Sequence, residues 1–285
     1  MKRELNFTGT SPILYIVATP IGNLDETNQR AIDILKEMDY IACEDTRVTI
    51  KLLNRFKIKK TLFSCREFNE VASAMKIIED LKKGLKIAYL TDAGYPAISD
   101  PGGRLIQKVL AEKIKVSVIS GSSAFLNALV GSGLNTERFY FHGFLSPREK
   151  VRAEELRHLI QRPETLIFYE APHRILKTLQ TMLQVLGNRR ACLARELTKK
   201  HEEYIRMNSS ELVELEKETL KGEMVIVIEG FNSESPMRFS DEDINKLVYS
   251  IIRTGVSPKD AIKKVSEQLN ISKNYVYKVY TNFLT

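Results

Sequence analysis

The sequence has few cysteines and no long apolar segment, and both features narrow the classes of protein to which it can belong. Three cysteines, at positions 43, 65 and 192, are too few and too scattered for a disulfide framework or a Cys-x-x-Cys metal site. No stretch approaches the roughly 18 uninterrupted apolar residues of a membrane span, and residues 1–10 lack the apolar core of a signal peptide. We therefore expect a cytoplasmic protein with buried thiols, no bound metal and no membrane association.

The composition is that of a folded globular protein. The chain has 285 residues, of which 43% are hydrophobic and 28% charged, which excludes wholesale disorder. At roughly 150 residues per domain, this length predicts two domains, with room for a small appendage. The 43 Lys and Arg residues against 36 Asp and Glu give a net charge of +7. This charge is compatible with a polyanionic partner but does not by itself identify one.

Short apolar runs alternate with helical patterns in the first half of the chain. Strands are predicted at residues 13–18, 40–43, 61–64, 86–91 and 116–119, and helices at residues 25–38, 46–56, 69–82, 104–112 and 122–130. This alternation implies right-handed crossovers and a mainly parallel sheet. We assign residues 1–134 to an N-terminal α/β domain.

A second group of elements predicts another α/β domain over residues 135–232. Its predicted strands are residues 138–142, 165–169, 191–195, 204–207 and 224–228, and its predicted helices are residues 148–161, 172–186 and 210–220. After a polar linker at 231–236, only helical patterns follow, at residues 241–253, 258–268 and 273–282. The predicted fold class is therefore α/β, with two α/β domains and a small helical unit over residues 237–285.

Three loops that follow predicted strands are the candidate ligand site. The longest, residues 91–103 (TDAGYPAISDPGG), is rich in Gly and Pro, and the shorter ones are residues 19–23 (TPIGN) and 120–124 (SGSSA). Open α/β sheets bind ligands at the carboxyl ends of their strands. None of the loops carries a GxGxxG or GxxxxGK[ST] phosphate motif. We expect them to converge on one crevice; the alternative for the longest is a connecting loop with caps at Asp92 and Asp100.

Six segments, spread in order over nearly the whole chain, carry a resemblance to known proteins. They are residues 14–24 (LYIVATPIGNL), 43–47 (CEDTR), 91–102 (TDAGYPAISDPG), 166–174 (LIFYEAPHR), 193–199 (LARELTK) and 222–228 (GEMVIVI). Together they resemble the ribosomal RNA small subunit methyltransferase I family of the tetrapyrrole methylase superfamily. At residues 120–124 the chain departs from the family, which usually has a G-P-[SC]-A turn preceded by proline. Replacing both prolines loosens the φ restriction of this turn.

The resemblance implies that S-adenosyl-L-methionine (SAM) binds in a cleft between the two α/β domains. The methyl group would go to the ribose 2′-hydroxyl of a cytidine in the decoding region of small-subunit (16S) rRNA, as free rRNA or within the assembled subunit. We also expect a homodimer. The cofactor contacts carried over by motif are Pro20, Asp92, Gly94, Tyr95, Ser123, Ala124, Tyr169, Ala194 and Met224.

The segment CEDTR offers candidates for the chemistry, because transfer to a ribose requires a positioned hydroxyl that loses its proton. Glu44 and Asp45 could take this proton or orient the ribose, and Arg47 could hold a phosphate. The alternative is a helix N-terminus capped by Asp45 or Thr46. Arg47, Lys51 and Arg55 share a predicted helix face, which would either bind phosphates or be solvated.

Two other functions stay open at this point. A small-molecule methylase of the tetrapyrrole type would need an apolar cleft wide enough for a macrocycle and no basic rim. A non-catalytic RNA-binding assembly factor could have lost catalysis through the altered loop at residues 120–124.

Overall fold

The first domain is built on a five-stranded parallel sheet. The computed structural model describes residues 12–216, 220–232, 241–269 and 272–283. The strand order is β3-β2-β4-β1-β5, with every neighbouring pair parallel, so the prediction of a parallel sheet is confirmed. The strands are β1 (Ile13–Val17), β2 (Tyr40–Cys43), β3 (Thr61–Ser64), β4 (Ile87–Leu90) and β5 (Lys115–Ile119). Because all five run in one direction, their carboxyl ends share one edge of the sheet.

Helices cover both faces of this sheet, which explains the near-continuous apolar character of its central strands. The helices α1 (Gln29–Glu37) and α2 (Thr46–Arg55) pack on one face around Leu35, Leu53 and Leu90. The helices α3 (Glu70–Lys82) and α4 (Gly103–Ala111) pack on the other, around Ile77 and Tyr89.

The predicted helix at residues 25–38 is wrong in its first turns. The structure has a short 3-10 helix, η1 (Leu24–Glu26), and then α1, which begins at Gln29. The side chain of Asn28 accepts a hydrogen bond from the backbone N–H of Ala31 at 2.8 Å and so caps α1. This cap starts the helix after the acidic residues that suggested an earlier start.

The second domain has a mixed sheet of order β6-β7-β10-β8-β9, in which only β6 and β7 pair in parallel. Its strands are β6 (Phe139–Phe144), β7 (Thr165–Glu170), β8 (Arg190–Arg195), β9 (Glu203–Asn208) and β10 (Met224–Ile228). The helices α6 (Glu149–Arg157), α7 (Ile175–Leu186) and α8 (Ser209–Leu212) share one apolar core with this sheet.

The helix α5 (Ala124–Ser132) joins the two domains. It follows β5 of the first sheet, and the predicted boundary at residue 134 places it with the first domain, but its buried residues Ala128 and Leu129 pack against the second sheet. The chain therefore crosses between the domains at the loop before α5. This loop is one of the three that we expected to line a crevice.

The predicted helix at residues 210–220 is also wrong. Only α8 is helical there, residues 213–216 are not helical, and residues 217–219 lie outside the described part of the chain. Leu212 and Leu220 are both buried in the core of the second domain. Tertiary packing rather than helical periodicity therefore sets the path of the chain between them.

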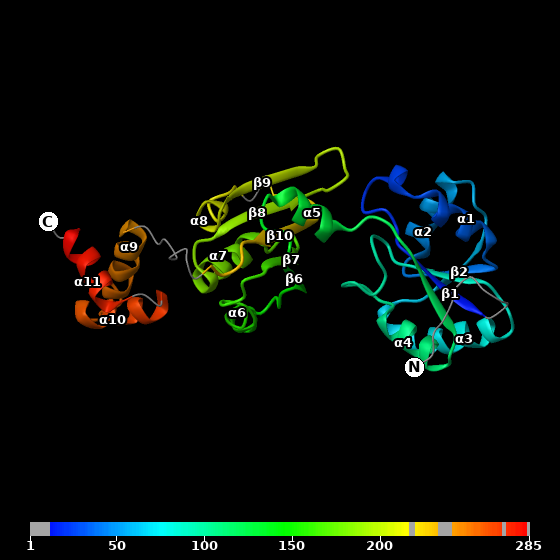
Figure 1. Ribbon diagram of the computed structural model, residues 1–285, viewed down its shortest axis with the longest axis horizontal. Helices are drawn as coiled ribbons and strands as arrows, with labels where there is room; N and C mark the ends of the chain where they lie inside the picture. The colour runs from blue at the N-terminus through cyan, green and yellow to red at the C-terminus, as the bar shows by residue number, and fades with distance from the viewer. Residues whose placement is uncertain (1–11, 217–219, 233–240, 270–271, 284–285) are drawn as a thin grey trace.

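The C-terminal unit is helical, as predicted. The helices α9 (Asp241–Ile252), α10 (Pro258–Leu269) and α11 (Lys273–Asn282) surround a core that includes Val248 and Val265 (Figure 1). Most of the predicted linker, from residue 233 onward, lies outside the described residues. No helix in the described ranges is long and apolar enough to cross a membrane. The three cysteines are buried and free, as expected.

Candidate active site

Three loops at the carboxyl edge of the first sheet are tied together by hydrogen bonds. Thr19 and Gly94 exchange a pair of backbone hydrogen bonds of 2.9 and 3.0 Å. The hydroxyl of Tyr95 accepts a hydrogen bond from the backbone N–H of Gly121 at 3.1 Å. A Cβ atom on Gly121 would lie 2.9 Å from the Cβ of Ala18, so only glycine lets the third loop lie against the first. The loops therefore converge, as the sequence predicts.

The longest of these loops holds an unfavourable backbone conformation. Ala97 and Ser99 have φ values of 71° and 60°, in the left-handed region that costs residues other than glycine about 1–3 kcal/mol each. The loop is fixed at its far end by Glu70 of α3, which is 3% exposed. Its carboxylate accepts hydrogen bonds from the backbone N–H groups of Gly102, at 3.1 Å, and Leu105, at 2.9 Å. Such enforced strain is typical of functional sites.

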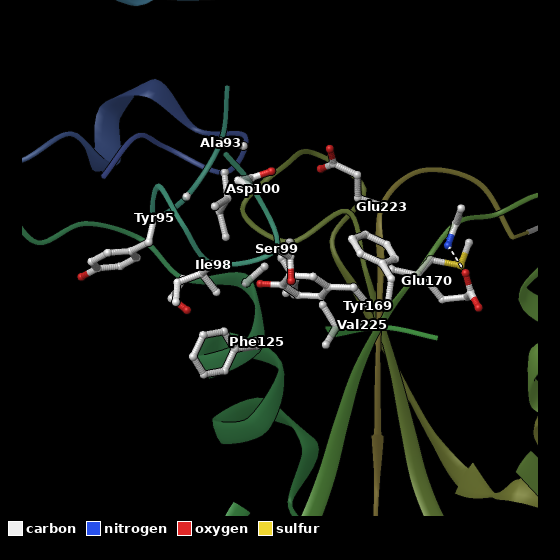
Figure 2. Close-up of a pocket in the computed structure, with 18 of the residues that line it drawn as sticks. Ala93, Tyr95, Ile98, Ser99, Asp100, Phe125, Tyr169, Glu170, Glu223 and Val225 are labelled. Atoms are coloured by element: carbon white, nitrogen blue, oxygen red, sulfur yellow. Dashed lines mark hydrogen bonds between the residues drawn. The ribbon is translucent and has the colours of Figure 1, made fainter. Parts of the chain in front are cut away.

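A pocket of about 290 Å³ lies between these loops and the carboxyl end of β7 in the second domain (Figure 2). Its volume is near the lower end of the range for small-molecule sites. The lining residues are Ile21, Ala93, Gly94, Tyr95, Ile98, Ser99, Asp100, Ser123, Ala124, Phe125, Phe144, Tyr169, Glu170, Ala171, Pro172, Leu197, Glu223, Met224 and Val225. The pocket is thus shared between the two domains, mostly apolar, and provided with a few polar groups.

An aromatic cluster forms one wall of the pocket. The rings of Phe125 and Phe141 stack with their centroids 4.5 Å apart, and Tyr169 contacts Phe141 at 5.0 Å and Phe144 at 5.5 Å. Burial raises the pKa of Tyr169 to about 12, so this phenol stays neutral. The wall is therefore rigid and uncharged, and it can pack against a flat ring.

The charges in the pocket are all negative. Asp100, Glu170 and Glu223 line it, and none of its lining residues is a lysine or arginine. Glu170 is buried and pairs with Arg174, and its second oxygen accepts a hydrogen bond from the Thr178 hydroxyl at 2.5 Å. The sequence suggests Asp100 only as a loop cap and does not single out the two glutamates. The position of Asp100 in a loop after a strand is the one local signal that points to it.

Six of the nine predicted cofactor contacts line the pocket. They are Gly94, Tyr95, Ser123, Ala124, Tyr169 and Met224. The other three do not. Pro20 lies between Thr19 and the lining residue Ile21, and Ala194 is fully buried inside the second sheet. Asp92 accepts a hydrogen bond from the backbone N–H of Asp45 at 3.2 Å, which ties two loops together.

The predicted catalytic residues Glu44, Asp45 and Arg47 lie beside the pocket rather than in its lining. Asp45 is the N-cap of α2, since its side chain accepts a hydrogen bond from the backbone N–H of Arg47 at 2.8 Å. The same carboxylate pairs with the Arg47 guanidinium at 2.5 Å. Hydrogen bonds from Arg47 hold the pKa of Asp45 well below its usual range, whereas burial, together with Asp92, raises the pKa of Glu44. The capping alternative therefore describes Asp45.

Comparison with known proteins identifies the family. Residues 13–213 match the family of tetrapyrrole (corrin/porphyrin) methylases. The chain is 42% identical to ribosomal RNA small subunit methyltransferase I of Bacillus subtilis over 98% of both chains, and 44% identical to the protein of that name from Halalkalibacterium halodurans over 94% of both. The chain belongs to the tetrapyrrole methylase family. Among solved structures, the methyltransferase CobJ shares the fold with a TM-score of 0.59 at 17% identity, covering 77% of this chain and 95% of CobJ.

Family membership makes this chain a SAM-dependent methyltransferase, and the residues of the pocket fit SAM. The aromatic wall suits an adenine ring. Carboxylates without any lysine or arginine in the lining suit a ligand that carries a positive sulfonium and an ammonium group. When bound, SAM supplies a methyl group that is already activated for transfer. The two-domain fold with a pocket between the domains confirms the predicted fold class.

Proposed function

We propose that this chain methylates the ribose 2′-hydroxyl of a cytidine in the decoding region of small-subunit rRNA. The observation that carries this proposal is the identity of 42% and 44% with two proteins named ribosomal RNA small subunit methyltransferase I, over almost the whole length of each. At this coverage the similarity extends over both domains that form the pocket. The substrate class of those relatives is therefore the best supported one for this chain.

In this proposal SAM occupies the pocket between the domains. The six predicted contacts in the lining would touch it, and Pro20, Asp92 and Ala194 would support these residues from behind. Glu44, Asp45 and Arg47 stay a prediction for contact with the RNA. The Arg47 side chain is 82% exposed, so its guanidinium could exchange the Asp45 carboxylate for a phosphate.

Basic side chains on and after α2 support a nucleic-acid partner. Lys51, Lys57 and Lys59 are exposed, and none of them forms an ion pair with another described residue. Arg55 pairs instead with Asp25, at 2.6 Å. Unpaired, exposed lysines on the domain that carries the three loops would attract the phosphates of an RNA.

The test is transfer of a tritiated methyl group from SAM to three acceptors: assembled small ribosomal subunits, free small-subunit rRNA and a tetrapyrrole. We expect label in rRNA, in one of its two forms, and an alkali-resistant dinucleotide after hydrolysis, because a 2′-O-methyl group blocks cleavage of the adjacent phosphodiester. Label in the tetrapyrrole alone would support the small-molecule methylase. Binding of SAM without transfer to any acceptor would support the assembly factor.

We also propose that the chain forms a homodimer through an apolar surface on the first domain. Phe68, in the 3-10 helix η2 (Glu67–Asn69), is 83% exposed, and Val71 and Met75 extend the same surface along α3. Light scattering should give twice the chain mass of 32.6 kDa. Replacement of Phe68 by Ser should lower this mass if the surface is the interface.

A further inference from the structure

Phe144, the last residue of β6, lines the cofactor pocket and is nevertheless 51% exposed. Because it belongs both to the lining and to the outer surface, it lies at the mouth of the pocket. Its ring contacts Tyr169, with the ring centroids 5.5 Å apart, and about half of the residue stays uncovered. An uncovered apolar side chain is common on an ordinary surface, but at the mouth of a pocket it is available to a ligand.

The backbone of β6 is bent so that Phe144 reaches this position. Phe141 and Phe144 are three residues apart, and in a regular strand such residues point to opposite faces of the sheet. The register with β7 shifts between Phe141 and Gly143, and Gly143 has a φ value of 83°. This bulge brings both phenylalanine rings against Tyr169. A Cβ atom on Gly143 would lie 3.1 Å from the hydroxyl oxygen of Ser99, so the bulge also packs on the long loop of the first domain.

The segment between β6 and α6 is held in place by hydrogen bonds. The backbone N–H of Ser146 donates to the Glu155 carboxylate of α6 at 2.9 Å. The buried guanidinium of Arg152, also in α6, donates to the Thr181 hydroxyl of α7 at 3.1 Å and to the backbone carbonyl of Pro147 at 3.4 Å. Because the segment is bonded to two helices, the side chains on it are presented at a fixed place.

Two cations follow Phe144 along this segment. Arg148 and Lys150 are exposed, and neither forms an ion pair or a side-chain hydrogen bond with another described residue. Four residues of chain span at most about 14 Å, so Arg148 lies near the mouth of the pocket. The parallel strand β7 ends at the same edge of the sheet, and the loop after it adds His173, which is exposed and directly follows two lining residues.

These cations are not explained by the stability of α6. Arg148 is the N-cap residue, but its side chain makes no capping hydrogen bond. The N-terminus of a helix favours negative charge, which suits Glu149 in the first turn but not the cations on either side of it. Two unpaired cations at an unfavourable place next to a pocket indicate an anionic ligand.

The distribution of charge fits the parts of an RNA strand. The charged residues of the pocket lining are all carboxylates, so the pocket itself does not attract phosphates. The unpaired cations lie outside it. A strand can therefore place one ribose in the pocket while its phosphates stay on the cations. An exposed aromatic ring beside cations is the usual combination in proteins that bind single-stranded nucleic acid.

We propose that Phe144, Arg148 and Lys150 form a docking surface for single-stranded RNA, which we call the Phe144 surface; this inference rests on the function proposed above. Phe144 stacks on a base next to the nucleotide that is methylated, and the two cations bind flanking phosphates. The stack fixes the neighbouring nucleotide, so that the target ribose enters the pocket. Stacking tolerates any base, so Phe144 contributes affinity and register rather than sequence specificity.

The first experiment is optical. The chain contains no tryptophan, so Phe144→Trp introduces a single fluorescent reporter. We expect a transcript of the decoding region of small-subunit rRNA, added to protein saturated with SAM, to quench this emission by stacking. Phe139→Trp is the matched control, because Phe139 is 41% exposed at the other end of β6 and does not line the pocket. Its emission should change much less.

The second experiment measures methylation of the form of rRNA that the parent protein accepts. Phe144→Ala should raise KM for this RNA by about 5- to 150-fold, the equivalent of about 1–3 kcal/mol for one stacked base. The values of kcat and of the SAM affinity should stay within about threefold, since a stack on a neighbouring base is the same before and during transfer. Phe144→Trp should keep the parent KM, whereas Phe144→Leu should not. Phe139→Ala should have no effect.

The third experiment tests the two cations. Arg148→Gln with Lys150→Gln should weaken RNA binding and flatten its salt dependence by about 0.7 for each phosphate, or about 1.4 in all. The affinity for SAM should not change. Arg157→Gln is the matched control, because Arg157 is an exposed arginine at the C-terminal end of the same helix. This variant should keep the parent salt dependence.

The outcomes separate this inference from the proposed function. If the transcript binds without quenching Phe144→Trp, or if Phe144→Ala keeps the parent KM, the Phe144 surface does not hold RNA. If Phe144→Ala loses affinity for SAM but not for RNA, Phe144 is a cofactor contact, which also overturns the inference. If the parent protein methylates no RNA although the transcript quenches Phe144→Trp and not Phe139→Trp, the proposed function fails and the Phe144 surface stands.

Discussion

Replacement of Glu70 by Ala should destabilise the first domain through the loop that carries the site. Glu70 is buried, and its carboxylate is the acceptor for the backbone N–H groups of Gly102 and Leu105, at 3.1 and 2.9 Å. These donors belong to the end of the long loop and the first turn of α4, and both residues are buried. Each buried N–H that is left without its partner costs about 1–3 kcal/mol, so we expect a decrease of roughly 2–6 kcal/mol in the free energy of unfolding.

The conservative change Glu70→Gln separates the hydrogen bonds from the charge. Its amide oxygen can still accept from both donors, and only the favourable interaction of a negative charge with the N-terminus of α4 is removed. That interaction is typically worth about 0.3–1 kcal/mol. The Gln variant should therefore be destabilised much less than the Ala variant. Because the loop lines the pocket, the affinity for SAM should fall in the same order.

Urea unfolding followed by circular dichroism measures the stability, and calorimetry measures the SAM affinity. Glu67→Ala is the matched control, because Glu67 is an exposed glutamate three residues earlier, and its replacement should change stability by no more than about 0.5 kcal/mol. The reasoning is refuted if Glu70→Ala is as stable as this control. It is refuted in part if the stability falls but SAM binds unchanged, because the loop would then not depend on Glu70.

Three further predictions concern charge. Arg174→Met should lower the free energy of unfolding by about 3–5 kcal/mol in urea titrations, because it removes the ion-pair partner of the buried Glu170. Lys51→Glu with Lys59→Glu should weaken rRNA binding in anisotropy assays, with unchanged SAM affinity, and should flatten the salt dependence by about 0.7–0.9 for each phosphate that the protein no longer neutralises. The raised pKa of Asp100 means that the folded protein binds this proton more tightly than the unfolded chain, so stability should fall as pH rises from about 3.8 to about 7. Asp100→Asn should abolish that fall in unfolding curves recorded from pH 4 to 8, and an unchanged pH dependence would contradict it.

The elements of the first sheet could be predicted from the sequence because local signals agree there with the fold. The predicted strands at residues 40–43 and 61–64 have the same bounds as β2 and β3. Both are apolar or β-branched runs bounded by polar segments, and alternation with helices indicates their parallel pairing. Where a side-chain cap decides the boundary, as Asn28 does for α1, helical periodicity alone places the start too early.

The second domain could be predicted less completely because its arrangement depends on contacts between distant residues. The strand β10 lies between β7 and β8 and is antiparallel to both, although β7 and β10 are separated by more than fifty residues of sequence. No pattern within the residues of these strands indicates that β10 lies between the other two. The sequence of α5 likewise does not indicate that this helix packs on the second sheet, since any apolar helix face would suit either sheet.

The same distinction explains which part of the site could be found from the sequence. A Gly- and Pro-rich loop after a strand is a local pattern, and it led to Gly94 and Tyr95, which line the pocket. The raised pKa of Asp100 could not be predicted from neighbouring residues in the sequence. It depends on burial and on carboxylates that follow β2, follow β4 and precede β10. The contacts of Asp45 are a second example, since a carboxylate after a strand is chemically suited to catalysis, and only the structure shows that it also caps α2 and pairs with Arg47. A carboxylate that is available to a ligand is therefore distinguished by the absence of a partner among the described residues, which can be known only once the fold has brought the other charges into place.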